Sequence, residues 1–284
     1  MAHPYDAIIP LFLANDPDHV CLVGSGVLVL LEAEYFLLTA AHVTDHLDGH
    51  HFLFIPGEDR IIQVEGGFAQ LGRAAERDEK TSSLDVAYYH LERSFVKRLS
   101  NCYHPIAKSG IGMLDQALND DLYSLAGYPT ATSIVESDSC AAEFFAMTGA
   151  VPHDRFYRKL GYRRDMHVLT QFNIRRNVML RGAAKSTPNP CGMSGGAIFS
   201  WPRDANPLEP NPYPRLVGIT TNWHQRHAIL AGTRIWCFIK CITMNNPDLI
   251  RLIPVEGDAC PVTKGRAPDA DRTKCGFRSD FGSN

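Results

Sequence analysis

The 284-residue sequence has no uninterrupted apolar run of about 18 residues, which is the length that a membrane-spanning helix requires. Its first residues, Met-Ala-His-Pro-Tyr-Asp, lack the positively charged segment and the apolar core of a secretory signal. The formal net charge is only −3, so the molecule as a whole is not suited to a polyanionic partner. From these absences we expect a cytoplasmic protein that binds neither a membrane nor a nucleic acid.

Cysteine is also sparse, because 8 cysteines in 284 residues are too few for a disulfide-built scaffold. Two groups have spacings that could bind a metal: His224 and His227 followed by Cys237 and Cys241, and the later pair Cys260 and Cys275. The segment Ile-Trp-Cys-Phe-Ile-Lys-Cys-Ile places Cys237 and Cys241 among apolar neighbours. Buried free thiols are therefore the preferred interpretation, and we expect no metal and no cofactor.

Long helical patterns and βαβ alternation are missing as well. Short β-forming runs separated by turn residues occur instead, and they are typical of an all-β barrel or sandwich. In the first half they are 6–13, 20–31, 34–43, 52–55, 61–64 and 84–91. In the second half they are 121–129, 141–147, 166–170, 177–180, 197–199, 216–220 and 235–239. Only 246–253, which begins Asn-Pro-Asp, has the start signal of a helix.

The length suits two adjacent halves of roughly 100 to 130 residues each. Between Val96 and Asp120 the strand pattern loosens, which indicates a linker. We therefore predict an N-terminal unit over 1–110 and a C-terminal unit over 111–254. Residues 255–284 carry five acidic and five basic residues, show no periodicity and predict a polar tail outside the core.

One segment departs from the overall charge balance. Between Val151 and Lys185 there are nine basic residues against two acidic ones, a local net charge of +7. On one face they could attract an acidic polypeptide or a nucleic acid. The preferred interpretation is a solvated surface whose counter-charges lie elsewhere in the fold.

Three short motifs carry the chemistry. Ser194 stands in Gly-Met-Ser-Gly-Gly, which is typical of a hydroxyl presented on a tight turn. Earlier in the chain, His42 stands in Leu-Thr-Ala-Ala-His-Val and Asp85 in Leu-Asp-Val-Ala. Acyl transfer by a serine needs a base for the hydroxyl proton, a group that orients the base, and N–H donors for the oxyanion. The chain order His, Asp, Ser is one of the known orders of such triads.

With these motifs the chain resembles a trypsin-like, chymotrypsin-fold serine peptidase over about residues 5–250, nearer to bacterial intracellular and HtrA-type members than to secreted digestive enzymes. The resemblance implies an all-β fold of two packed six-stranded antiparallel barrels, followed by the helix expected near the C-terminus. The site would lie between the barrels, with His42 and Asp85 from the first and Ser194 from the second.

The resemblance also implies a role for each matching residue. His42 would be the general base and then the general acid, Asp85 would orient it, and Ser194 would be the nucleophile of an endopeptidase. The backbone N–H groups of Gly192 and Ser194 would form the oxyanion hole. The substrate, a protein or peptide, would contact a further set of residues: Asn189, Thr220, Thr221 and Asn222.

Two departures from the family pattern are informative. Members that are activated by N-terminal clipping keep an aspartate before the serine, where this chain has Met193, so we expect no such activation. The segment Ser186–Pro190, at the base of the specificity pocket, contains no acid, so a preference for Lys or Arg is not supported. A neutral or small apolar side chain is expected there instead.

Two other functions remain open. Met193 and the basic segment would also suit a catalytically inactive peptide-binding or scaffold module. A cysteine peptidase is disfavoured because Cys191 lies three residues before Ser194. For an active enzyme we expect control by a regulatory protein partner, by the polar tail or by ordering of the loop from Asn189 to Met193.

Overall fold

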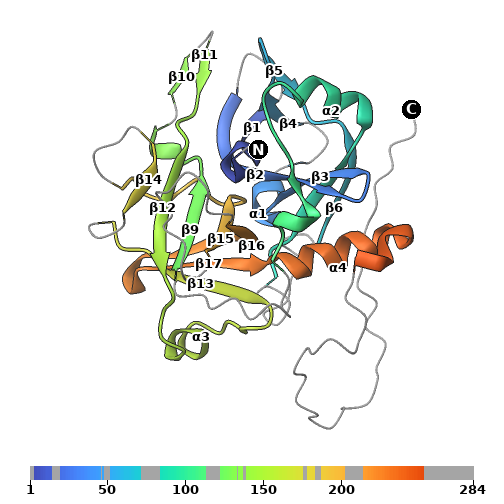
Figure 1. Cartoon of the computed structure of the whole chain (residues 1–284). Coiled ribbons are helices and arrows are strands. Elements are labelled where there is room, and N and C mark those ends of the chain that lie inside the picture. Colours follow the sequence, from blue (N-terminus) through green and yellow to red (C-terminus); the bar gives the residue numbers. More distant parts are fainter. Residues whose placement is uncertain are drawn as a thin grey trace.

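The computed structural model describes residues 3–14, 20–45, 47, 52–71, 84–112, 122–132, 134–136, 139–174, 178–182, 187–201 and 214–252. The predicted polar tail 255–284 lies outside these residues. The described chain forms two antiparallel sheets that curl side by side, with few and mostly short helices (Figure 1). The predicted all-β fold is confirmed, as a closed six-stranded barrel beside a curled half-barrel sheet, which is consistent with the predicted chymotrypsin-like double barrel.

The first sheet is an open, strongly curled sheet. Its strands are β1 (Ile8–Ala14), β2 (Val20–Leu31), β3 (Glu34–Thr39), β4 (Phe52–Pro56), β5 (Ile61–Gln63), β6 (Gly66–Gln70), β7 (Ala87–Leu91) and β8 (Ile106–Ala107). They are hydrogen-bonded in the order β5-β4-β1-β2-β3-β7-β6, and β8 pairs in parallel with β2. No pairing between the end strands β5 and β6 closes this sheet within the described residues. The helices attached to it are η1 (Pro4–Ala7), α1 (Ala41–Thr44), α2 (Arg93–Leu99) and η3 (Lys108–Gly110).

The second sheet closes on itself. Its strands are β9 (Leu122–Gly127), β12 (Phe145–Ala150), β13 (His167–Gln171), β14 (Met179–Arg181), β15 (Ala197–Ser200), β16 (Arg215–His224) and β17 (Ile229–Arg234). The order is β13-β17-β16-β15-β9-β12-β14, and a further pairing of β13 with β12 makes a closed six-stranded barrel. Short elements decorate it: η4 (Thr130–Thr132), a hairpin of β10 (Ile134–Glu136) and β11 (Ser139–Ala141), α3 (Arg155–Lys159) and η5 (Gln225–His227).

Two predicted strands are corrected by the structure. The run 235–239 is not a strand but the start of α4 (Ile235–Asn245), in which Ile235, Phe238 and Ile239 are buried at helical spacing. A short apolar run has no alternation by which strand and helix can be told apart, and here the packing decides. The predicted strand 34–43 ends at Thr39, and His42 lies in α1. The predicted helix 246–253 is the 3-10 helix η6 (Pro247–Leu252), and part of the predicted linker forms α2 and β8.

The two sheets share a continuous core. One cluster of buried residues includes Phe36 and Tyr88 of the first sheet, Phe199 of the second and Phe238 of α4. A separate cluster fills the closed barrel and includes Met193. Because the buried surface runs across the seam, side chains at the seam are held by both sheets. Among the described residues, no helix is long and apolar enough to cross a membrane.

Candidate active site

His42 and Asp85 are joined by two hydrogen bonds. The Nδ1 atom of His42 lies 2.5 Å from Oδ2 of Asp85, and the main-chain N–H of His42 donates to Oδ1 at 3.0 Å. Asp85 is buried, with 7% of its surface exposed. An ionised carboxylate only accepts hydrogen bonds, so beside it a neutral imidazole carries its proton on Nδ1 and has its lone pair on Nε2. The two contacts fix both the orientation and the tautomer of the imidazole.

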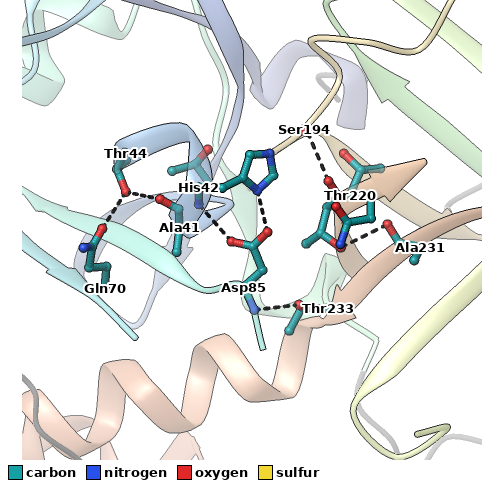
Figure 2. Close-up of polar contacts among 12 residues, drawn as sticks. Ala41, His42, Thr44, Gln70, Asp85, Ser194, Thr220, Ala231 and Thr233 are labelled. Atoms are coloured by element: carbon teal, nitrogen blue, oxygen red, sulfur yellow. Dashed lines mark hydrogen bonds and ion pairs between the residues drawn. The ribbon is translucent and has the colours of Figure 1, made fainter. Parts of the chain in front are cut away.

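Asp85 is itself held by the second barrel. Its main-chain N–H donates to Oγ1 of Thr233 on β17 at 3.5 Å. Thr233 is fully buried, so its hydroxyl is fixed by the surrounding packing. The orienting carboxylate therefore comes from the first sheet but is positioned by both (Figure 2).

Ser194 lies on a tight turn that ends at β15. The turn needs positive φ at Gly192 (+89°) and Gly195 (+83°), which is a conformation that favours glycine. A Cβ atom at Gly195 would lie 1.9 Å from the carbonyl oxygen of Ser25, so no larger residue fits there. The hydroxyl of Ser194 donates to the carbonyl oxygen of Thr221 at 3.2 Å, which places Oγ beside β16.

Strand β2 contacts both the main chain of Ser194 and the residue that follows His42. The N–H of Ser25 donates to the carbonyl oxygen of Ser194 at 2.7 Å. At the preceding residue, a Cβ atom on Gly24 would lie 2.8 Å from Val43 and 2.9 Å from the same carbonyl oxygen of Ser194. Val43, which follows His42, and the main chain of Ser194 thus both pack against Gly24 of β2. In Figure 2 the imidazole of His42 lies between the carboxylate of Asp85 and Ser194.

The turn before Ser194 presents two unused donors. The N–H groups of Gly192 and Ser194 donate to no acceptor among the described residues. The amide between them, that of Met193, donates to the carbonyl oxygen of Pro190 at 3.0 Å. The amide of Met193 is therefore occupied, while those of Gly192 and Ser194 on either side of it could bind a negatively charged oxygen.

The conformation of this turn is held from three sides. The N–H of Thr130 donates to the carbonyl oxygen of Cys191 at 2.8 Å. The side chain of Asn189 accepts from the N–H of Cys191 at 3.0 Å. The side chain of Met193 is fully buried in the core of the closed barrel, where an apolar group is stabilised.

The residues expected to contact the substrate lie close to Ser194. Some of their side chains are already buried or hydrogen-bonded within the protein. Thr220 is 1% exposed, and its hydroxyl contacts the carbonyl oxygens of Met193 and Gly196. Its N–H also donates to Gly196 at 2.8 Å, so Thr220 braces the turn. Asn189 uses its side-chain oxygen on Cys191.

An open strand edge begins one residue after Thr220. Strand β15 pairs with β16 only up to Ile219, whereas β17 pairs along the other side as far as His224. Among the described strands, the part of β16 from Thr221 to His224 therefore has a partner on one side only. The other side can accept an added strand.

Several residues of the site were missed by the sequence analysis. They are Ser25, Thr130, Tyr162 and Thr233. The hydroxyl of Tyr162 lies 2.9 Å from Nε2 of His224, and the amide of Asn222 donates to the same hydroxyl at 3.4 Å. Burial raises the pKa of Tyr162, and burial together with His227 lowers the pKa of His224. The only sequence signal for any of them is the pair of glycines, Gly24 and Gly26, that flanks Ser25.

Among the described residues, those considered for a metal are not brought together, and the pair Cys260 and Cys275 lies outside the described residues. Cys237 and Cys241 are buried in α4, as expected for core thiols, and His224 contacts Tyr162. The part of the chain that the structure describes contains no group of three or more His, Cys, Asp or Glu side chains arranged to hold a metal ion.

Comparison with known proteins gives structural neighbours but no sequence relatives. No family model matches the chain, and no curated protein matches it. Among solved structures, a Glu endopeptidase in complex with MPD aligns at 13% identity, with a TM-score of 0.49, over 87% of this chain and 93% of that one. The serine protease domain of the Sesbania mosaic virus polyprotein aligns at 12% identity, with a TM-score of 0.43, over 81% and 89%.

A catalytically inactive tobacco etch virus protease complexed with substrate aligns at 12% identity, with a TM-score of 0.42, over 85% of this chain and 84% of that one. The expected likeness to bacterial HtrA-type members finds no support among these structures. At such low identity, what this chain does has to be argued from its own residues.

Proposed function

We propose that this protein is a serine endopeptidase that hydrolyses peptide bonds with His42, Asp85 and Ser194. The observation that carries the proposal is the double contact of Asp85 with the ring and the main chain of His42. A carboxylate that fixes the tautomer of a histidine leaves Nε2 ready to take a proton from a nearby hydroxyl. A histidine that served only packing would not need a buried carboxylate as its partner.

In the proposed reaction, Oγ of Ser194 attacks the carbonyl carbon of the scissile bond while its proton passes to Nε2 of His42. The carbonyl oxygen becomes an oxyanion. When the tetrahedral intermediate collapses, the C–N bond breaks and His42 gives its proton to the leaving amine. Water then attacks the acyl-enzyme, again losing its proton to His42. The ester bond breaks, and Ser194 recovers a proton from the imidazolium, which Asp85 stabilises throughout.

The free N–H groups of Gly192 and Ser194 would bind the oxyanion. Each such donor contributes roughly 3 kcal/mol of transition-state stabilisation. Their availability within the described residues supports this role, and so does the contact of Thr130 with Cys191, which holds the turn in place before substrate arrives. Because these two N–H groups already point in a fixed direction, the turn would not have to change its conformation when the oxyanion forms.

The substrate would bind as an extended strand on the open edge of β16, from Thr221 onwards. Main-chain hydrogen bonds would hold it there, and alternate side chains would enter pockets on either side. The hydroxyl of Ser194 already points at the carbonyl oxygen of Thr221, so a strand on this edge would reach the nucleophile. The absence of acid from 186–190 still argues against a preference for Lys or Arg.

Activation by N-terminal clipping is not part of this proposal. In such a mechanism a new ammonium would need a charged partner beside the serine. The side chain of Met193 instead lies in the apolar core of the closed barrel. The turn is thus anchored by burial of Met193 and by Thr130, with no need for an ion pair.

The proposal is tested by hydrolysis of a peptide library together with covalent labelling by a fluorophosphonate. We expect the label on Ser194, and we expect Ser194→Ala to lower kcat by about five to six orders of magnitude. Ser100→Ala, which changes an exposed serine at the end of α2, is the matched control and should behave like the wild type. An unlabelled Ser194, or equal rates for wild type and Ser194→Ala, would contradict the proposal and favour a non-catalytic peptide-binding module.

A further inference from the structure

A positively charged surface lies on the second barrel, outside the proposed catalytic site. Arg155, Arg158 and Lys159 occur at positions i, i+3 and i+4 of α3, so they share one face of that helix. All three are exposed, whereas Tyr157 on the opposite face is buried. Figure 1 shows α3 below β13, at the end of the closed barrel.

A second element extends this surface. Phe156 of α3 and His227 of η5 have ring centroids 6.3 Å apart, which places the two short helices side by side. Arg226 of η5 is exposed. We call Arg155, Arg158, Lys159 and Arg226 together the α3–η5 surface.

The backbone under this surface is firmly held. The hydroxyl of Tyr157 accepts from the N–H of Leu169 on β13 at 3.0 Å. A cluster of buried side chains packs beneath α3 and η5: Tyr157, Leu169, Ile229 and Ala231. The positions of the four charges are therefore set by the barrel, although their side chains extend into solvent.

In the described part of the chain, this surface in particular has no counter-charges. Elsewhere in the basic segment, Arg163 pairs with Asp165, Arg164 with Asp154 and Arg181 with Asp6. Among the described residues, no carboxylate lies within ion-pair distance of the four side chains of the α3–η5 surface. The preferred interpretation of the sequence, in which counter-charges lie elsewhere in the fold, thus holds for Arg181. Arg163 and Arg164 pair with the two acids of the segment itself, and α3 has no such partner among the described residues. Arg175, Arg176 and Lys185 lie outside the described residues.

The α3–η5 surface continues the open edge of β16. That edge runs from Thr221, which accepts the hydroxyl of Ser194, to His224, and η5 follows directly. On the other side, Tyr162 follows α3 and contacts His224 at 2.9 Å. The path from the proposed catalytic site to the charged surface is therefore continuous along the chain and in space.

The geometry of a β-strand indicates how many substrate residues separate the scissile bond from the α3–η5 surface. Both strand partners of β16 are antiparallel to it, and an added strand that continues this pattern would run toward its own N-terminus from Thr221 to Arg226. The three residue steps from Thr221 to His224 span about 10 Å at about 3.3 Å per residue, and η5, which carries Arg226, begins at the next position. Side chains about four to six residues before the scissile bond would then reach the α3–η5 surface.

We propose that the α3–η5 surface docks an acidic segment of the substrate, four to six residues on the amino side of the cleaved bond. The inference rests on the proposed peptidase function and adds a substrate class to it, namely proteins with clustered Asp or Glu before the cleavage site. Fixed positive charges without local partners attract such a segment, accelerate its association and lose this effect as salt rises.

Two peptides test the proposal, identical around the cleaved bond but carrying Asp-Glu-Glu or Asn-Gln-Gln at those positions. Their affinities are measured by fluorescence anisotropy with Ser194→Ala, which cannot turn them over, and their kcat/KM values with the wild type. We expect the acidic peptide to bind about tenfold more tightly at 50 mM salt, since several exposed ion pairs contribute modestly each. The difference should vanish near 0.5 M salt, as expected for screened surface charges.

A pair of double variants locates the effect. Arg158→Glu with Lys159→Glu should abolish or reverse the preference and leave kcat on the neutral peptide unchanged. Lys97→Glu with Lys240→Glu changes the net charge equally at exposed positions on α2 and α4, and it should keep the preference. If the control double variant loses the preference to the same extent, the attraction is a property of net charge and the proposal is wrong.

Other outcomes separate this inference from the proposed function. Equal binding of both peptides by Ser194→Ala, with normal hydrolysis by the wild type, would overturn the docking site alone. Preferential binding of the acidic peptide without any hydrolysis would support the docking site and overturn the peptidase. Binding of a single-stranded RNA oligonucleotide, with no binding of the acidic peptide, would overturn the proposal in favour of a nucleic-acid surface.

Discussion

The N–H of Ser25 donates to the carbonyl oxygen of Ser194 at 2.7 Å, so the first sheet is bonded directly to the main chain of the proposed nucleophile. The hydroxyl of Ser25 also accepts from the N–H of Tyr128 at 2.9 Å. Its carbonyl oxygen accepts from the hydroxyl of Thr39, close to His42, at 2.8 Å. One fully buried serine thereby ties together the segments that carry the histidine and the nucleophile.

Ser25→Ala is expected to lower both stability and activity. It leaves the N–H of Tyr128 without its acceptor, which costs about 1 to 3 kcal/mol of unfolding free energy. Urea denaturation measures this loss, and initial rates on a model peptide report the accompanying shift of the turn. Ser100→Ala, at an exposed site, should change stability by less than about 0.5 kcal/mol. A loss no larger than that control would contradict the role assigned to Ser25.

Asp85→Asn is expected to lower kcat by about four orders of magnitude, because an amide at this position favours the wrong tautomer of His42. The side chain keeps its size, so circular dichroism should match the wild type. A reduction of less than tenfold, measured by initial rates in a correctly folded variant, would remove Asp85 from the proposed mechanism.

Gly192→Ala is expected to displace the turn that carries the two free donors. Its Cβ atom would lie 2.5 Å from Cγ2 and 2.6 Å from the N of Thr130. Loss of one oxyanion donor lowers kcat by about 100- to 1000-fold. The matched control is Gly161→Ala, at φ +74° with nothing within 4 Å of the added atom. The control should lose only about 1 to 2 kcal/mol of stability and keep its kcat, and equal kcat values for both variants would contradict this prediction.

Met193→Asp is expected to destabilise the fold by about 3 to 5 kcal/mol, because it buries an unpaired carboxylate in the apolar core of the closed barrel. Met193→Leu keeps the position apolar and should cost less than about 1.5 kcal/mol. Chemical denaturation of both variants measures the difference. Equal stability of the two would mean that the turn is not anchored by burial at this residue.

Acid is expected to destabilise the fold partly through His224. Burial, with a contribution from His227, lowers the pKa of folded His224 below its ordinary value of 6.5. As the pH falls through 6.5, the unfolded chain binds the proton first, so this contribution is complete above that pH and is lost below it. His224→Gln should therefore have a flatter dependence of unfolding free energy on pH between 7 and about 5. Parallel curves for the variant and the wild type would contradict the prediction.

The type of fold and the candidate residues of the site were already readable in the amino-acid sequence. Short β-forming runs between turn residues predicted an all-β chain, because alternation and turn chemistry are local properties. The local settings of His42, Asp85 and Ser194 pointed to a triad, and Met193 pointed away from activation by clipping.

The contacts that hold the site in place depend on how the chain packs in three dimensions. Ser25 and Ser194, and Asp85 and Thr233, are far apart in the sequence, and each pair meets only when the two sheets pack. Thr130 and Cys191 meet when the closed barrel forms. The run 235–239 became a helix because its apolar face at helical spacing fits the shared core, which no local pattern revealed. Arg181 of the basic segment likewise found its partner Asp6 only through packing, since the two residues are 175 positions apart along the chain.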